Sequence, residues 1–584
     1  MTTAEPACCK PQKQTPDPLA CFDLGITMAG AVSAGAYTAG VIDFLIEALD
    51  AWQDAKDAGE DVPRHDVNLK VLTGASAGSI VAAIMAVCLP YRFPHQRHDS
   101  PLPADDALTG NPLYDTWVQQ IDIHQLLTTH DLDNDKPVSS LLDSTCLTTL
   151  ADSLLDYRPP ASASLLSMTI QRKYVADQLP ILLTVNNLRG VPYKVSMKGD
   201  GHARHDMTLH AHHVAFSLNS ASGNQTPITP AATVLNYPNH HAADNWKALG
   251  EAALASSAFP LGLAPREITQ PLLVFNETAF TRPGALYTWP DGQEPPGIPS
   301  LYTASELIKL QPCWPVPMPD AVSMLCVDGG TLNNEPFELA RRVLAGPNNR
   351  NPRDGQTAKR AVLMIDPFPD ETDFTKNDKD IGLFDTLKAL LGASTNNARF
   401  KPDEIALALD ETIYSRFIMT PSRCDTDNVL KTPALSSGAL DGFAGFLNKD
   451  FRRHDYLLGR RNCQRFLENH FSLPEANNLF DAWTCKQRTA YLNKGELPII
   501  PLVPRLRGTE HGGRDEPLPT WPKRSFDEAR LKRQIEQRLV LLVPRLLEKK
   551  SFQRRIFGWV AVHLLKRCAS KDAIENIKKS IDKN

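Results

Sequence analysis

The sequence of 584 residues lacks several features that would assign a chain to a class at once. No stretch approaches the roughly 18 consecutive apolar residues of a membrane span, and residues 1–18 contain no apolar stretch of the signal-peptide type. The 11 cysteines include no C-x-x-C pair, so they are expected to be reduced thiols of a cytosolic protein and not a disulfide framework. There is no internal repeat. These absences argue against a membrane-spanning, secreted or repeat protein.

The composition is that of a soluble chain, with 42% apolar and 22% charged residues. The net charge of −5 hides an asymmetry. Residues 523–584 contain 17 Lys and Arg against 7 Asp and Glu, a balance of +10, and the rest of the chain carries −15. A basic C-terminal segment on an acidic body predicts either contact with an anionic surface or docking on the protein itself.

Hydrophobic periodicity predicts an α/β arrangement up to about residue 370 and a largely helical chain beyond it. Strands are expected over residues 22–28, 272–276, 323–327 and 360–366. Helices are expected over 36–55, 139–155 and 243–256. Residues 180–197 are expected to form a β-hairpin around 188–190, and residues 90–137 and 198–243 to be irregular or polar loops.

Ser76 lies in the stretch K-V-L-T-G-A-S-A-G-S-I-V-A, residues 70–82. An apolar run precedes it, small residues surround it, and apolar residues at helical spacing follow it. This is the strand, tight turn and helix context in which G-x-S-x-G forms a nucleophile elbow. Such a turn strains the backbone of the serine, so Gly74 and Gly78 are needed beside it. The pattern indicates a catalytic nucleophile, although an incidental serine in a small-residue turn would have the same sequence.

Two further stretches place polar or small groups at strand ends. In C-V-D-G-G-T-L-N-N-E-P, residues 326–336, an apolar strand delivers Asp328 onto Gly329 and Gly330. Active sites of α/β sheets lie at such ends, although an aspartate that caps an ordinary turn would look the same. In M-A-G-A-V-S-A-G, residues 28–35, small residues before a helix let backbone N–H groups approach a ligand closely. Tight strand–helix packing is the alternative.

In this order the three stretches resemble the patatin-like phospholipases, whose motifs are a glycine-rich oxyanion loop, G-x-S-x-G and a distant D-G-[GA]. Ala255–Pro260 is similar to the A-S-x-A-x-P segment of that family, and Asn333–Pro336 matches the tail after its aspartate. The resemblance covers roughly residues 20–370.

The resemblance implies an α/β fold, a three-layer sandwich with a mostly parallel central sheet, followed by a mainly helical C-terminal region. It divides the chain into a disordered tail over 1–20, a catalytic domain over 21–370 with insertions near 90–180 and 198–243, and a helical region over 371–584 that includes the basic segment 523–584.

The implied activity is lipid acyl hydrolysis, of the phospholipase A or esterase type, through a Ser–Asp dyad. Asp328 would take the proton of Ser76, which would attack an ester carbonyl, and the acyl-enzyme would then be hydrolysed. Backbone N–H groups of Gly30, Ala31 and Val32 would form the oxyanion hole. The glycines expected to support these motifs are Gly35, Gly74, Gly78, Gly329 and Gly330.

No metal or cofactor is required for this chemistry. The expected partner is a lipid or phospholipid and not a nucleic acid. The expected location is the cytoplasm, with peripheral membrane contact as an addition. The oligomeric state does not follow from the sequence.

The oxyanion loop departs from the family pattern G-G-G-x-R-G, because Ala31, Val32 and Ala34 replace two glycines and the arginine. Residues other than glycine avoid positive φ, so the loop must follow an ordinary backbone path or bear strain. Two alternatives therefore stay open. One is an inactive lipid-binding or scaffold protein with this fold; the other is an α/β-hydrolase with a Ser–Asp–His triad, for which His454 has the best polar neighbours.

Two polar clusters suggest other functions. Histidines at 202–213 and 240–241 could bind a metal, but no cysteine or well-placed carboxylate completes the set, so a polar insertion is favoured. Arginines between 452 and 465 could bind a phosphate headgroup, but a helix paired with nearby acidic residues is favoured.

The basic segment places apolar residues at near-helical spacing from Leu531 to Val560, and Pro544 is expected to kink or split its first helix. Such a helix either lies on an anionic bilayer or packs on the body of the protein. The uninterrupted periodicity favours packing on the body.

Overall fold

The structure is a computed structural model that describes residues 20–547 and 570–581 with internal gaps. The gaps are 102–106, 134–136, 158–169, 171, 197–203, 221–231, 237–243, 277–278, 283–305, 310, 347–350, 369–411 (apart from 386, 390 and 393), 425–428, 441, 524–525, 572 and 580. Almost all of the predicted tail over 1–20 therefore lies outside the described residues.

A mixed, mostly parallel sheet of nine strands forms the centre of the fold, in the order β11-β10-β1-β2-β3-β4-β5, with β9 pairing both β3 and β6. The strands of this sheet are β1 (Cys21–Met28), β2 (Asp66–Gly74), β3 (Gln178–Ser196), β4 (Arg204–Asn219), β5 (Thr233–Asn236), β6 (Arg266–Pro271), β9 (Ala321–Asp328), β10 (Arg360–Ile365) and β11 (Arg416–Met419). β11, β10, β1, β2 and β3 run parallel, so their carboxyl ends meet at one edge of the sheet. β9 runs antiparallel to β3 and places Asp328 opposite Val185. The predicted α/β fold with a mostly parallel sheet is confirmed.

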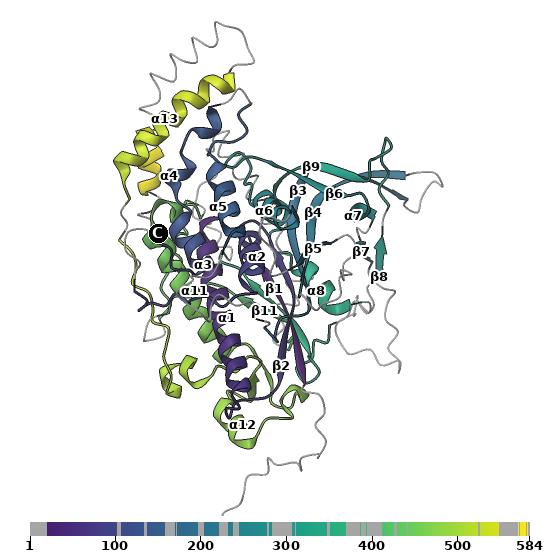
Figure 1. The fold of residues 1–584 in the computed structure, drawn as a ribbon, viewed down its shortest axis with the longest axis vertical. Coiled ribbons are helices and arrows are strands. Elements are labelled where there is room, and N and C mark those ends of the chain that lie inside the picture. Colours follow the sequence, from purple (N-terminus) through teal and green to yellow (C-terminus); the bar gives the residue numbers. More distant parts are fainter. Residues whose placement is uncertain are drawn as a thin grey trace, which may run out of the picture.

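Helices cover both faces of the sheet (Figure 1). On one face lie α1 (Gly35–Asp57), α2 (Ala77–Cys88) and α11 (Lys449–Asn469), which share one large apolar core with the sheet. On the other face α8 (Phe337–Ala345) packs Phe337, Ala340 and Leu344 on β2 and β10. Other helices of the described residues include α3 (Pro112–Tyr114), α4 (Ile123–Leu126), α5 (Thr145–Leu155), α6 (Asp244–Ser256), α7 (Leu273–Asn276), α12 (Cys485–Tyr491) and α13 (Glu528–Leu547).

The predicted β-hairpin over 180–197 is wrong. β3 is one long strand that pairs with β4, and the residues predicted to turn form an irregularity between Asn186 and Val191. Gly190 adopts φ 75° within it, so the glycine serves a bulge and not a chain reversal. The predicted polar loop over 198–243 is also wrong, since it contains β4 and β5. The histidines of β4 hid its strand character, because they lower the apolar signal on which a strand prediction depends.

The strand expected over 272–276 is displaced. β6 ends at Pro271, and the next residues form the short helix α7. β6 alternates between exposed residues and the buried Ile268 and Gln270. β6 has a single buried apolar side chain, whereas Leu272–Phe275 is a continuous apolar run. The apolar run therefore predicted a strand more strongly than β6 did. The helix expected over 139–155 begins later, at Thr145.

The C-terminal region shares the core of the α/β region. β11 extends the central sheet beside β10, and apolar residues of α11 and of residues 471–506 belong to the same buried cluster as β1 and α1. A domain boundary near 370 stays a prediction, because residues 370–411 lie almost wholly outside the described part of the chain.

The basic segment packs on the body through α13, which lies beside α4 at the upper end of the view in Figure 1. Leu531 is buried with Leu127, Ala444 and Leu447, and Arg538 forms a bidentate ion pair with Asp131 at 2.8 Å. The prediction of docking on the body is therefore confirmed for the described part of the segment. The helix continues through Pro544 to Leu547, so the predicted split is not seen. Phe552 to Val560 lie outside the described residues.

One segment, Val32–Asp57, is long and apolar enough to cross a membrane by composition alone. It consists of α1 and the turn before it, and 94% of its most apolar window is buried inside the protein. Two glycines bring α1 into close contact with α11: a Cβ on Gly40 would lie 1.9 Å from the carbonyl of Tyr456, and one on Gly459 would lie 2.2 Å from that of Tyr37. The segment is therefore a core helix of this fold.

Candidate active site

Ser76 occupies a sharp turn between β2 and α2. Its backbone has φ 49° and ψ −123°, a conformation that non-glycine residues rarely adopt. The two glycines around it are sterically required, because a Cβ on Gly74 would lie 2.6 Å from the carbonyl oxygen of Gly78, and one on Gly78 would lie 2.2 Å from that of Met28. The local structure is the strained strand–turn–helix that the sequence predicts.

Asp328 ends β9 and meets Ser76 directly. Ser76 Oγ donates a hydrogen bond of 2.7 Å to Asp328 Oδ2, and Asp328 Oδ1 accepts one of 2.7 Å from the amide of Gly330. Only 4% of Asp328 and 8% of Ser76 are exposed. Burial raises the pKa of Asp328 from 3.8 to about 6, while the hydrogen bonds from Ser76 and Gly330 act in the opposite direction. The structure thus pairs the two predicted residues as a hydroxyl and a carboxylate of raised proton affinity.

Because the pKa of Asp328 is higher in the folded protein than in the unfolded chain, its ionisation opposes folding. The contribution of Asp328 to the free energy of unfolding should fall as the pH rises from below 3.8 through about 6. We expect Asp328→Asn to raise the free energy of unfolding at pH 8 by about 1–3 kcal/mol, since one pKa unit corresponds to about 1.4 kcal/mol. Urea unfolding at pH 8 and below pH 4 checks this, and an equal advantage of the variant at both pH values would contradict it.

Two serines at the end of α6 hold the backbone of Ser76. Ser256 Oγ accepts a hydrogen bond of 3.0 Å from the Ser76 amide, and Ser257 Oγ donates one of 2.9 Å to the Ser76 carbonyl. Ser256 Oγ also contacts Ser79 Oγ at 2.7 Å. From the sequence, these serines have no predicted role beyond membership of the segment Ala255–Pro260. A hydroxyl group that forms a hydrogen bond with the backbone of a distant segment produces no periodic pattern in the sequence around it.

The predicted oxyanion loop follows β1 and bears the strain that its sequence implied. Val32 adopts φ 47°, and Ala31 has φ −150°. Positive φ in a β-branched residue is a clear outlier. The Gly30 amide is bonded to the Asn334 carbonyl at 3.3 Å, whereas the Ala31 and Val32 amides donate to no backbone carbonyl within the described chain. Of the three predicted donors, these two are therefore the ones available to a substrate oxygen.

The side chain of Asn334 lies between the predicted motifs. A Cβ on Gly30 would lie 2.3 Å from Asn334 Oδ1 and 2.9 Å from Ser76 Cβ, and a Cβ on Gly330 would lie 2.6 Å from Asn334 Oδ1. Both positions therefore require glycine. Asn334 is 4% exposed, and its Nδ2 has no hydrogen-bond partner among the described residues. A buried donor without a partner is costly, and it lies next to the nucleophile.

The predicted supporting glycines serve packing more than flexibility. A Cβ on Gly35 would lie 2.3 Å from the Trp117 ring, and one on Gly329 would lie 2.2 Å from the Thr184 carbonyl. Neither glycine has a positive φ. They allow the turns at the start of α1 and after β9 to approach neighbouring elements closely.

The histidine of the triad alternative is placed elsewhere. His454 Nδ1 contacts Asp455 Oδ1 at 2.8 Å, and the His454 ring lies edge-on to Trp521. The hydroxyl of Ser76 is bonded to Asp328 and not to a histidine. His563, which also follows Asp328 in the chain, lies outside the described residues.

The histidines suggested as metal ligands and the arginines suggested as a phosphate site have other contacts at several of the described positions. His210 and His212 contact the backbone carbonyls of Asn187 and Leu209, while residues 202 and 240–241 lie outside the described part. Among the described residues, no group of three or more His, Cys, Asp or Glu is arranged to hold a metal ion. On α11, Arg460 pairs with acidic side chains, as the helix interpretation predicts.

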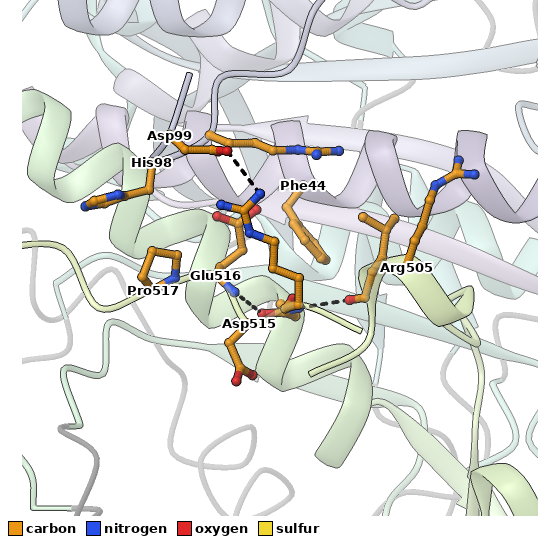
Figure 2. Close-up of a pocket in the computed structure, with 11 residues that line it drawn as sticks. Phe44, His98, Asp99, Arg505, Asp515, Glu516 and Pro517 are labelled. Carbon is orange, nitrogen blue, oxygen red and sulfur yellow. Dashed lines mark hydrogen bonds and ion pairs between the residues drawn. The ribbon is translucent and has the colours of Figure 1, made fainter. Parts of the chain in front are cut away.

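A separate polar pocket lies between α1 and residues 505–517 (Figure 2). Arg514 pairs with Asp99 across it at 3.0 Å, and Gln464 accepts a hydrogen bond of 2.7 Å from the Glu516 amide. None of the residues that line this pocket is a predicted site residue. Its polar lining does not suit an acyl chain.

Fold and site together define a class: an α/β protein with a serine elbow and an aspartate partner at the carboxyl edge of a mostly parallel sheet. The family model of the patatin-like phospholipases matches residues 26–341, and the chain belongs to this family of lipid acyl hydrolases. It is also 32% identical to the uncharacterized protein y4iI of Sinorhizobium fredii (strain NBRC 101917 / NGR234), over 95% of this chain and 82% of that protein.

Proposed function

We propose that this protein is a serine-dependent lipid acyl hydrolase that cleaves carboxylic esters through a dyad of Ser76 and Asp328. The observation that carries the proposal is the 2.7 Å hydrogen bond between the serine hydroxyl and a buried aspartate. Asp328 takes the proton of Ser76 as Ser76 Oγ attacks the ester carbonyl, and the alcohol leaves with a proton. The same carboxylate then activates water to hydrolyse the acyl-enzyme. The amides of Ala31 and Val32 stabilise the oxyanion in both steps.

An apolar cavity supports a lipid acyl group as the part of the substrate bound. It lies between α2, α5 and α6, and every residue that lines it except Thr116 is apolar or glycine. Ile80 lines the end nearest the nucleophile, one helical turn after Ser76, and Val87 lies about 10 Å further along α2. α6 lines the cavity and ends at the serines that hold Ser76. The shared elements α2 and α6 support the proposal that this cavity receives the acyl chain of an ester whose carbonyl lies at Ser76.

Filling this cavity should shorten the preferred acyl chain. A Cβ on Gly250 of α6 would lie 3.7 Å from Leu155 Cδ1 and 3.8 Å from Ala151 Cβ, which leaves room for the first atom of a side chain that would occupy the cavity. We expect Gly250→Leu to lower kcat/KM for a dodecanoyl p-nitrophenyl ester at least about 10-fold, because each methylene denied burial costs about 0.8 kcal/mol. The butanoyl ester should react within about twofold of the wild type.

The matched control is Lys247→Leu, which adds the same side chain to the exposed face of α6. It should leave the rates for both esters unchanged. An equal loss for both esters in Gly250→Leu would indicate damage to the site, and no loss for either would show that the acyl chain binds elsewhere.

The pH dependence of hydrolysis should report Asp328. Its carboxylate must be ionised to accept the proton of Ser76, and burial raises its pKa to about 6. We expect kcat/KM to fall about tenfold per pH unit below pH 6 and to be level above it. A profile measured from pH 4.5 to 8 checks this, and an inflection near pH 4 would contradict a buried, desolvated base.

The identity of the lipid is best tested with products. Mixed membrane lipids incubated with the wild type and with Ser76→Ala should differ by free fatty acids and lysolipids, detected by mass spectrometry. Equal products from both proteins would favour the alternative, a lipid-binding or scaffold protein. The strained oxyanion loop motivates that alternative.

Cytoplasmic location with peripheral membrane contact remains part of the proposal, supported by the balance of +10 over residues 523–584.

A further inference from the structure

The oxyanion loop is held by contacts from residues more than 400 positions away in the chain. The Ser33 amide donates a hydrogen bond of 3.1 Å to the Gly442 carbonyl, and Ser33 Oγ donates a second one to the same oxygen. Ser33 Oγ in turn accepts a hydrogen bond of 3.1 Å from the Gly445 amide. Ser33 is completely buried, so these bonds are shielded from water. They fix the residue that directly follows Val32.

The two glycines allow this close approach. A Cβ on Gly445 would lie 2.4 Å from Ser33 Oγ, so another residue there would displace the loop. Gly442 has φ 89°, and a Cβ on it would lie 2.8 Å from the Phe368 ring and 3.4 Å from Val32 Cβ. Both positions therefore admit little besides glycine.

The segment that carries these glycines is itself anchored on α11. Asp455 is fully buried and accepts hydrogen bonds from the amides and hydroxyls of Ser436 and Ser437. Arg452 Nη1 donates one of 2.7 Å to the Gly445 carbonyl. Since α11 packs closely on α1, which begins directly after the oxyanion loop, the anchor and the loop are fixed relative to each other.

We propose that these contacts set the conformation of the oxyanion loop, so that Ser33 and Asp455 are positioning residues for the hydrolysis proposed above. A β-branched residue at φ 47° relaxes unless its surroundings over-determine it. The bonds to Gly442 and Gly445 supply that constraint and aim the Ala31 and Val32 amides at the substrate oxygen. The loop thus keeps its conformation although Ala31 and Val32 replace two glycines of the family pattern.

The inference also gives the C-terminal region a role in the site. Gly442, Gly445 and Asp455 lie beyond residues 26–341, the part that the family model matches. The similarity to y4iI covers 95% of the chain and thus includes most of this region. α13 packs on the same segment, since Leu531 shares a buried cluster with Ala439, Ala444 and Leu447. The catalytic geometry therefore depends on residues outside the family-model match.

The test compares Ser33→Ala with a rescue variant that carries Val32→Gly as well, using p-nitrophenyl butyrate and the full-length chain. We expect Ser33→Ala to lower kcat about 10-fold to 100-fold with KM within about twofold, below the 10²–10³ that losing an oxyanion donor outright costs. Glycine adopts positive φ without strain, so the Val32→Gly/Ser33→Ala protein should regain most of the lost kcat. Asp455→Asn, acting through the same loop, should also lower kcat and be rescued by Val32→Gly.

Ser415→Ala is the matched control, because Ser415 is a buried serine of the same C-terminal region that makes no contact with the loop. It should leave kcat unchanged. A kcat of Ser33→Ala equal to that of Ser415→Ala would overturn the inference. So would a loss that Val32→Gly does not restore although thermal unfolding shows a folded protein, because a purely structural defect would not be rescued by a glycine in the loop.

The same assay separates this inference from the proposed function. Hydrolysis by the wild type that Ser76→Ala removes supports the function, whatever Ser33→Ala does. Equal hydrolysis by the wild type and Ser76→Ala would overturn both, since there would then be no oxyanion at this site to stabilise.

Discussion

Ser76→Ala and Asp328→Asn are each expected to lower kcat for ester hydrolysis by at least about 10⁴-fold, and the double variant to be no worse than either single one. Alanine removes the nucleophile, and asparagine cannot take the proton that the 2.7 Å hydrogen bond presents to Asp328. Members of a catalytic unit act together, so their losses do not add. Steady-state and single-turnover kinetics with a p-nitrophenyl ester measure both effects.

Two exposed residues provide matched controls: Asp320, directly before β9, and Ser323, within β9. Ser323→Ala and Asp320→Asn make the same chemical changes on the surface of the same part of the fold and should leave kcat within about twofold. Circular dichroism and thermal unfolding should show that all variants fold. Activity of Asp328→Asn near the wild-type level would refute the dyad. Losses that multiply in the double variant would show that the two residues act independently.

The local geometry of Ser76 and Asp328 could be predicted because its constraints are local. The turn at Ser76 needs glycine at 74 and 78 in any sequence that forms it, and the apolar strand before Asp328 specifies a buried strand end. The sequence also predicted that the oxyanion loop either follows an ordinary backbone path or bears strain. Val32 bears the strain, with φ 47°. Short-range steric rules were sufficient for these features.

The parts that could not be predicted depend on contacts between distant segments. Nothing near Ser33 in the sequence indicates that Gly442 and Gly445 will bond to it, because hydrogen bonds to a backbone impose no pattern on the partner segment. β4 was missed for a related reason. Its histidines lie on a strand stabilised by pairing with β3, and pairing on both sides of the irregularity at Asn186–Val191 overrides a weak local preference.

The largest stability effect is expected at Arg460, where α11 meets α1. Its guanidinium is completely buried and pairs with Asp43, with Glu47 at 2.6 Å and with Glu516 at 2.7 Å. Burial alone would raise the pKa of Asp43, but the neighbouring His95 and Arg460 hold it well below its usual range. Two of the acids have a second basic partner, since His95 contacts Asp43 and Arg97 pairs with Glu47. Arg461 donates a hydrogen bond of 2.6 Å to the backbone carbonyl of Glu516, whereas the Glu516 carboxylate forms an ion pair with Arg460.

Arg460→Met should therefore lower the free energy of unfolding by about 3–5 kcal/mol, because it removes the shared cation and leaves carboxylates buried without it. Urea unfolding at pH 7 measures the loss. Arg465→Met, on the same helix but partly exposed, should change stability by no more than about 0.5 kcal/mol. Adding Glu516→Gln to Arg460→Met should recover part of the loss, because it removes one of the buried carboxylates that pair with Arg460. If Arg460→Met were as stable as the wild type, the buried charges would not hold α11 on α1. The position of the oxyanion loop would then have to depend on the contacts of Ser33 and Asp455 alone.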